Sequence, residues 1–96
     1  MKPSTALETH REAIRRIVSH HRASNPRVFG SVLHGDDTDG SDLDLLVDPS
    51  AEASLLDIAR IQVELERHLG VSVDVLTPKA LPDQFRDQVL REARSI

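Results

Sequence analysis

The sequence predicts an α+β fold in which a small mixed β-sheet is covered by helices, in the element order α-β-β-α-β-α. Two observations predict this fold. Three segments carry apolar residues at helical spacing, and three others have the apolar, β-prone composition of strands. These segments share a chain of 96 residues, a length that suits one domain with a thin core. We therefore expect a single domain over residues 1–96.

The first half of the chain predicts one helix and two strands. Residues 6–21 carry apolar side chains at i, i+4 and i+7 spacing, which is typical of an amphipathic helix that Asn25-Pro26 then interrupts. Residues 27–29 form a short β-prone run, and residues 31–35 suit one helical turn before polar turn residues. Residues 42–47 return to an apolar strand. The second strand therefore begins within a run of aspartates.

The second half predicts a helix, a strand and a last helix. Residues 54–69 have apolar side chains near helical spacing, and Gly70 suits the position just past the helix end. Residues 71–77 alternate apolar and polar side chains, the pattern of a half-buried strand. Residues 82–94 carry apolar side chains four positions apart and predict the final helix.

The composition narrows the function classes. The net charge is −4 and there are two Phe but no Tyr or Trp, which disfavours a protein that coats DNA or RNA by charge or by stacking. The absence of Cys excludes disulfides and thiolate metal sites. No apolar run reaches membrane-spanning length and no signal core is evident. We expect a cytoplasmic protein with no membrane partner and no direct nucleic-acid partner.

Three carboxylates are candidates for a metal site. Alternation along a strand places Asp42 and Asp44 on one face and Leu43 on the other. Asp74 projects from the polar face of the last strand, so three carboxylates converge if the two strands are neighbours. Two such charges about 5 Å apart repel by roughly 3 kcal/mol at an effective dielectric near 20. Either one carboxylate takes up a proton or a cation neutralises the charges, and hard oxygen ligands favour Mg²⁺ or Mn²⁺ as that cation.

Other polar residues in the same region suit structural roles. Asp36, Asp37 and Asp39 are typical of solvated turns, and Asp48 is typical of a strand end. We also expect four helical histidines to face solvent: His10, His20, His21 and His68.

A glycine-serine pair precedes the carboxylates. The segment GSVLHGDD has two glycines, but Asp36 stands where a P-loop requires Lys, and the EF-hand pattern also fails. Gly30-Ser31 nevertheless follows a predicted strand and opens a helical turn. Backbone N–H groups and the Ser31 hydroxyl can donate to an anion there, which suits a phosphate cradle.

These residues resemble a known signature. Gly30-Ser31, ten further residues, Asp42-Leu43-Asp44 and a later Asp74 together resemble the GS-x10-DxD pattern of the DNA polymerase β-like nucleotidyltransferases. The resemblance covers about residues 10–94, and the stretches VDVLTP and FRDQVLREA are similar to the minimal nucleotidyltransferase branch. Members of that branch are usually the antitoxins of HEPN–MNT toxin–antitoxin modules.

The resemblance implies a role for each matched residue. Asp42, Asp44 and Asp74 would act as the catalytic carboxylates and would hold two Mg²⁺ ions with ATP as the substrate. Gly30 and Ser31 would bind the outer phosphates. The implied reaction is transfer of AMP from ATP to a tyrosine hydroxyl of a cognate HEPN ribonuclease toxin, which this antitoxin would thereby neutralise.

One departure from the pattern concerns the position three residues after the serine, where relatives often carry Arg and this chain carries His34. A neutral His is a weaker phosphate partner than a bidentate Arg. His34 is therefore either a nucleotide-binding residue or a loop side chain without contacts.

Three functions stay open on the sequence. The chain is an adenylyltransferase, a non-catalytic antitoxin that neutralises its toxin by covering it, or a subunit of a small-molecule nucleotidyltransferase. So short a chain leaves little room for an acceptor-binding domain. We therefore expect the acceptor surface to come from the toxin or from a second subunit, in a hetero-oligomer or a homodimer.

Overall fold

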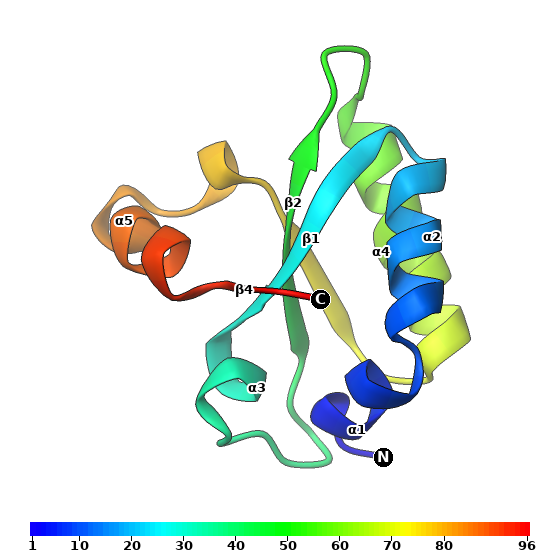
Figure 1. Ribbon diagram of the computed structural model, residues 1–96, viewed down its shortest axis with the longest axis vertical. Coiled ribbons are helices and arrows are strands. Elements are labelled where there is room, and N and C mark those ends of the chain that lie inside the picture. Colours follow the sequence, from blue (N-terminus) through cyan, green and yellow to red (C-terminus); the bar gives the residue numbers. More distant parts are fainter.

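The computed structural model describes all 96 residues, Met1–Ile96. They form a four-stranded sheet with short helices (Figure 1). In chain order the elements are α1 (Pro3–Thr9), α2 (Arg11–His20), β1 (Ala23–Phe29), α3 (Gly30–His34), β2 (Leu43–Pro49), α4 (Leu55–Leu69), β3 (Val73–Leu76), the 3₁₀ turn η1 (Pro78–Ala80), α5 (Asp83–Glu92) and β4 (Arg94–Ser95).

The sheet is mixed and has the strand order β3-β2-β1-β4. Strand β1 pairs antiparallel with both β2 and β4, whereas β2 and β3 run parallel. Helices α2 and α4 cover one face of the sheet, and α5 lies on the other side (Figure 1). This arrangement confirms the predicted α+β fold class. None of the helices is both long and apolar enough to cross a lipid bilayer.

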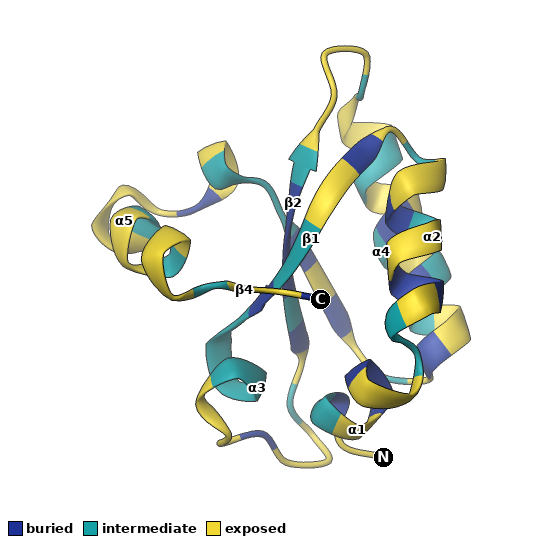
Figure 2. Cartoon of the chain, in the orientation of Figure 1, coloured by how far each residue is buried: buried dark blue, intermediate teal, exposed yellow.

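The core lies between the sheet and the pair α2 and α4 (Figure 2). Leu43, Leu45 and Val47 alternate along β2 and are fully buried, together with Ile14 from α2 and Ile61 from α4. Burying each such side chain contributes about 1.5–3 kcal/mol. Because strand residues alternate between faces, the residues between these three point to the α5 side of the sheet. The core thus fixes which face of β2 carries Asp44.

Helix α4 has well-defined ends. The Ser54 hydroxyl accepts the N–H of Asp57, and the Asp57 carboxylate accepts the N–H of Ser54, which is a capping box. Gly70 ends the helix in the left-handed conformation with φ of 72°. The helix predicted over 54–69 is therefore confirmed.

The first predicted helix is two helices in the structure, so its prediction as one continuous helix is wrong. Residues 6–21 divide into α1 and α2 at His10, whose φ of −121° and ψ of 26° leave the helical range. The helix also ends before Asn25-Pro26, because Arg22 takes a positive φ of 64° and turns the chain into β1. Pro26 lies inside β1, where the register shifts between Ser24 and Arg27 and no ladder N–H is required of it.

The predicted element order omitted β4 and the separate α1. Helix α5 ends at Glu92, and β4 pairs with β1 through Arg27↔Ser95 and Val28↔Arg94. A two-residue strand has no periodicity that a sequence pattern could reveal. The apolar residues of α5 also do not form a buried face, since Phe85 is 55 % exposed and no residue of the helix is buried.

The outer edge of β3 is closed by side chains of α4. The N–H of Val73 donates to Glu66 Oε2 and the N–H of Val75 donates to Gln62 Oε1, each at 3.1 Å. An edge strand with free N–H groups invites pairing with another chain. These two contacts satisfy the donors and block strand addition at this edge.

We predict that the double variant Gln62→Ala, Glu66→Ala is destabilised and self-associates. Each lost hydrogen bond at a partly buried donor costs about 1 kcal/mol, so the free energy of unfolding falls by about 2 kcal/mol. Urea unfolding and light scattering at several concentrations check both effects. The exposed Arg60→Ala on the same helix is the control. If the double variant has the same free energy of unfolding and the same solution mass as the wild type, the two side chains do not protect this edge.

Candidate active site

Two of the predicted carboxylates stand directly opposite each other in the sheet. Asp44 on β2 and Asp74 on β3 are partners in the parallel register. Leu43 and Leu45 point into the core, so Asp44 projects from the face that α2 and α4 leave free. Asp42 lies just before β2, which begins at Leu43 and not at residue 42 as predicted. The strands that carry the carboxylates are therefore neighbours.

Burial and the neighbouring negative charges raise the pKa of Asp44. Its pKa is raised from the ordinary 3.8 to about 6, first by burial, then by the negative charge of Asp74 and then by that of Asp42. Asp44 is half-buried, whereas Asp42 and Asp74 are exposed. The group of carboxylates thus holds negative charge that no protein cation compensates.

Gly30 brings the glycine-serine pair against the same carboxylate. Its φ of 74° lies in the left-handed region, and a Cβ built on it would stand 2.2 Å from Asp44 Oδ2. A side chain at this position would force the Asp44 carboxylate to move, and the backbone conformation itself favours glycine. Gly30 opens α3, and half-buried Ser31 occupies its first turn. The two halves of the predicted site, separated by ten residues in the sequence, therefore meet in space.

The fit of these residues to a metal ion rests on donor type and charge. Carboxylate oxygens suit Mg²⁺ or Mn²⁺, and the raised pKa of Asp44 shows charge that a divalent cation would relieve. No group of three or more His, Asp or Glu side chains is arranged to hold a metal ion as the side chains stand. A three-carboxylate site would require the side chains to reorient.

His34 does not lie free at the end of α3. Its Nε2 is 3.3 Å from Glu92 Oε2 of α5, and the ring is half-exposed. The interpretation of His34 as a loop side chain without contacts is therefore wrong. Its role in nucleotide binding stays a prediction.

Asp37 is a structural residue that the sequence interpretation missed. We expected a solvated turn, but Asp37 is only 7 % exposed, and its Oδ2 accepts the N–H of Ser4 at 2.8 Å. This hydrogen bond lowers the pKa of Asp37. It ties the loop between Gly30 and Asp42 to the start of α1. The two residues are 33 apart along the chain, so no local sequence pattern could reveal this hydrogen bond.

Two other assignments are corrected by side-chain contacts. Asp48 does not merely end its strand, because Oδ1 pairs with Arg27 Nη2 at 2.5 Å. His21 does not face solvent: its side chain is 11 % exposed, and Nε2 lies 2.9 Å from Glu64 Oε1.

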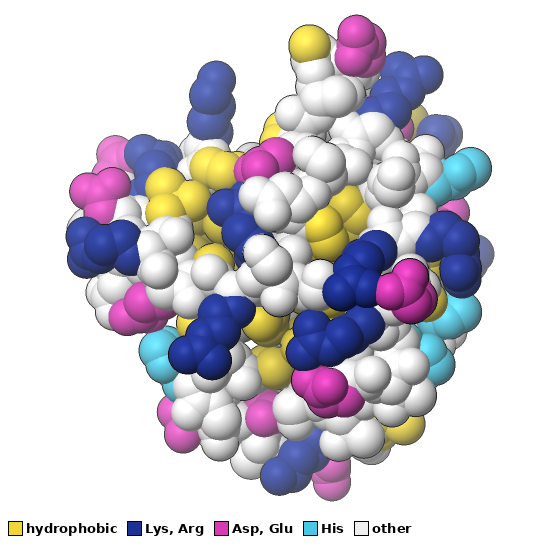
Figure 3. Space-filling view, viewed as in Figure 1, with side chains coloured by type: hydrophobic (Ala, Val, Ile, Leu, Met, Phe, Trp, Pro, Cys, Tyr) yellow, Lys and Arg dark blue, Asp and Glu magenta, His cyan; other side chains and the backbone are white.

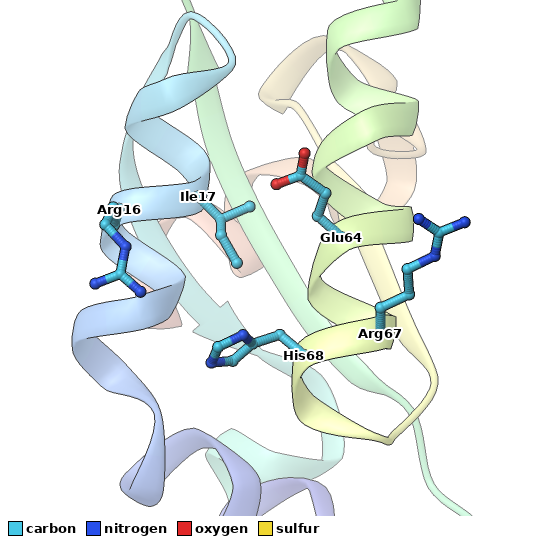
Figure 4. Close-up of a pocket in the computed structure, with 5 residues that line it drawn as sticks. All are labelled: Arg16, Ile17, Glu64, Arg67 and His68. Atoms are coloured by element: carbon cyan, nitrogen blue, oxygen red, sulfur yellow. The ribbon is translucent and has the colours of Figure 1, made fainter.

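A separate depression of about 390 Å³ lies between α2 and α4 (Figure 4). His68 points toward α2 within it, whereas Arg67 points away. It contains none of the predicted site residues and lies on the sheet face opposite Asp44. The depression is therefore not part of the candidate site.

We predict that Asp44→Asn stabilises the metal-free protein at neutral pH. Because the folded-state pKa of about 6 exceeds the ordinary 3.8, ionised Asp44 destabilises the fold fully above pH 6 and not at all below 3.8. After allowance for solvent screening, the gain at pH 7.5 is about 1–2 kcal/mol, and it vanishes near pH 4.

Urea unfolding in EDTA at both pH values measures this gain. The exposed Asp36→Asn is the control. A gain for Asp44→Asn that is equal at pH 4 and pH 7.5 would show that Asp44 does not carry the repulsion.

Comparison with known proteins identifies the family. The family model described as polymerase beta nucleotidyltransferase matches residues 12–96. "Putative protein adenylyltransferase MJ0435" of Methanocaldococcus jannaschii is 38% identical over 77 residues, which cover 80% of this chain and 83% of that protein. "Protein adenylyltransferase MntA" of Thermococcus cleftensis is 38% identical over 65 residues, 68% of this chain and 66% of that protein.

Solved structures agree with the fold. A structure described as "putative minimal nucleotidyltransferase" superposes with a TM-score of 0.87 and 44% identity, and the match covers 100% of this chain and 97% of that one. A toxin–antitoxin structure with AMP-PNP gives a TM-score of 0.74 at 17% identity, over 88% of this chain and 69% of that one, which supports the fold alone. The family match over most of the chain and the paired carboxylates lead to one conclusion: the chain belongs to the polymerase beta nucleotidyltransferase family and is a minimal nucleotidyltransferase.

Proposed function

We propose that residues 1–96 act as one catalytic domain, an antitoxin that transfers AMP from ATP to a tyrosine hydroxyl of a cognate HEPN ribonuclease toxin. The observation that carries the proposal is the contact of Gly30 with Asp44, beside Asp74 on the neighbouring strand. The names of the two protein adenylyltransferase relatives support protein as the acceptor. The toxin–antitoxin structure with AMP-PNP among the structural neighbours suggests a toxin as that protein.

Gly30 and Ser31 would hold the outer phosphates of ATP. The positive φ of Gly30 turns the chain into α3, whose first N–H groups are without helical partners and are available to an anion. Phosphate oxygens would thereby lie beside the carboxylates without a side chain between them. Gly30 thus supplies both the turn and the space.

Asp42, Asp44 and Asp74 would hold Mg²⁺, which when bound supplies charge neutralisation and activation of the attacking oxygen. The tyrosine oxygen would form a bond to the α-phosphorus while the bond to pyrophosphate breaks. Asp74 is exposed on the edge strand β3 and would accept the hydroxyl proton. An acceptor on another protein can reach this position from solvent.

A second candidate function is neutralisation by binding alone. The observations that favour it are the absence of a group arranged for a metal ion and the contact of His34 with Glu92. A small-molecule acceptor in an oligomer has no comparable observation in its favour. The binding and catalytic functions differ in whether the toxin is chemically changed.

We predict that the wild type, ATP and Mg²⁺ modify the purified toxin by one or more AMP groups, and that Asp74→Asn lowers the rate at least 100-fold. The reason is that Asn cannot accept the hydroxyl proton. Intact-mass spectrometry of the toxin measures the modification, and Asp36→Asn is the control. If the protein inhibits the toxin's ribonuclease activity but the toxin stays unmodified, the proposal is contradicted and neutralisation by binding alone takes its place.

We predict that Gly30→Ala abolishes nucleotide binding, because the added methyl group would collide with Asp44 and strain the backbone at φ 74°. Titration calorimetry with AMP-PNP and Mg²⁺ measures the loss. Gly35→Ala is the matched control, since Gly35 has a φ of 76° and nothing lies within 4 Å of the Cβ it would add. Equal affinities for the two variants would contradict a phosphate site at Gly30.

A further inference from the structure

Helix α4 carries apolar side chains on its outer surface as well as on the surface that packs in the core. Three of the chain's six exposed large apolar side chains lie on it: Leu55 is 89 % exposed, Leu56 57 % and Val63 46 %. Ala59 between them is exposed too. These residues are spaced three or four positions apart, so they form one stripe along about two turns of the helix. We call Leu55, Leu56, Ala59 and Val63 the outer stripe of α4.

Two arginines beside the outer stripe have no carboxylate partner. Arg60 and Arg67 are exposed, and neither takes part in any of the ion pairs of the structure. The acidic residues of α4 make contacts within the chain instead, namely Asp57, Glu64 and Glu66. The surface around the outer stripe therefore combines apolar side chains with positive charge that the chain itself leaves unpaired.

One side of the outer stripe borders the edge of the sheet. Ala59 and Val63 each lie three positions before a residue that accepts an N–H of β3, Gln62 and Glu66. Residues three apart are neighbours on a helix surface, so the stripe adjoins these two side chains. A protein seated on the outer stripe would therefore lie along β3, the strand on which Asp74 is exposed.

The other side of α4 is a different surface. Glu64 and His68 point toward α2, whereas Arg67 points away from it (Figure 4). Histidine side chains gather along the side of the molecule that α2 forms, on the right of Figure 3. The outer stripe is thus distinct from the depression between α2 and α4.

A helix is the partner structure that fits the outer stripe. An added strand finds no free donor here, because Gln62 and Glu66 already accept the N–H groups of β3. Side chains three and four apart form ridges that pack into the grooves of another helix. A two-fold pairing of two outer stripes would bring four arginines together without a free carboxylate among them, which disfavours a second copy of this chain.

We propose that the outer stripe of α4 docks an amphipathic helix of the acceptor protein, and that Asp or Glu side chains beside the apolar face of that helix pair with Arg60 and Arg67. The inference rests on the proposed function, in which the acceptor is the toxin, and it adds where on this chain the toxin is held. The outer stripe contains no residue of the candidate active site, so docking leaves the nucleotide site open. The toxin then reaches Asp74 across the edge of β3.

Titration calorimetry with the purified toxin measures the docking. Val63→Glu should weaken toxin binding at least about 10-fold, because a carboxylate would be buried in the interface without a partner. Arg60→Glu should weaken it about 3–10-fold, and less at high salt, because an attraction between opposite charges becomes a repulsion. Both variants should bind AMP-PNP as the wild type does. Saturating toxin should restore their rate of AMP transfer.

Leu90→Glu is the matched control, because Leu90 is 39 % exposed but lies on α5, on the other side of the sheet. Circular dichroism confirms that each variant is folded. If the toxin is modified but the Val63 and Arg60 variants bind it as the control does, this inference is overturned and the proposed function stands. If Val63→Glu instead converts a homodimer to a monomer in light scattering, with toxin affinity unchanged, the stripe joins two copies and the inference is also overturned.

The remaining outcomes separate this inference from the proposed function. Toxin binding that depends on Val63 and Arg60, without modification of the toxin, would support the docking surface and contradict the proposed transfer of AMP. If the wild type neither binds nor modifies the toxin, the proposed function fails and the inference fails with it.

Discussion

The close approach of the Gly30 backbone to the Asp44 carboxylate is the constraint on which the site depends. It needs a positive φ at Gly30, no Cβ there, and a β2 register that points Asp44 away from the core. Three separate features of the sequence satisfy these needs: the glycine itself, the alternation of β2, and the antiparallel pairing of β1 with β2. A Cβ at Gly30 would displace the Asp44 carboxylate, and a one-residue shift in the β2 register would turn Asp44 toward the core.

The same arrangement opposes stability. Asp44 is held half-buried between Asp74 and Asp42, and its raised pKa records the unfavourable charge. The apolar face of β2 offsets this, because Leu43, Leu45 and Val47 are fully buried on the opposite side. A strand can carry acidic residues on one face when its other face is anchored in this way. The destabilised group is then the one on which the proposed chemistry depends.

Much of the fold and part of the site could be predicted from the sequence. The alternation of β2 and β3 indicated the faces of Asp44 and Asp74, and helical periodicity followed by Gly70 located α4. The roles of Asp37, Asp48 and His21 could not be predicted, because each depends on a partner 21 to 43 residues away along the chain. Strand β4 could not be predicted for a different reason, because a strand of two residues carries no periodicity.

The central claim is that Gly30, Asp44 and Asp74 form one site for a metal–nucleotide complex. A crystal structure with Mn²⁺ and AMP-PNP, with the metal located by its anomalous scattering, tests it most directly. The account predicts a manganese peak within coordination distance of Asp44 and Asp74, with phosphate oxygens against Gly30 and Ser31. Manganese or nucleotide bound elsewhere, such as between α2 and α4, with these carboxylates free, would contradict it.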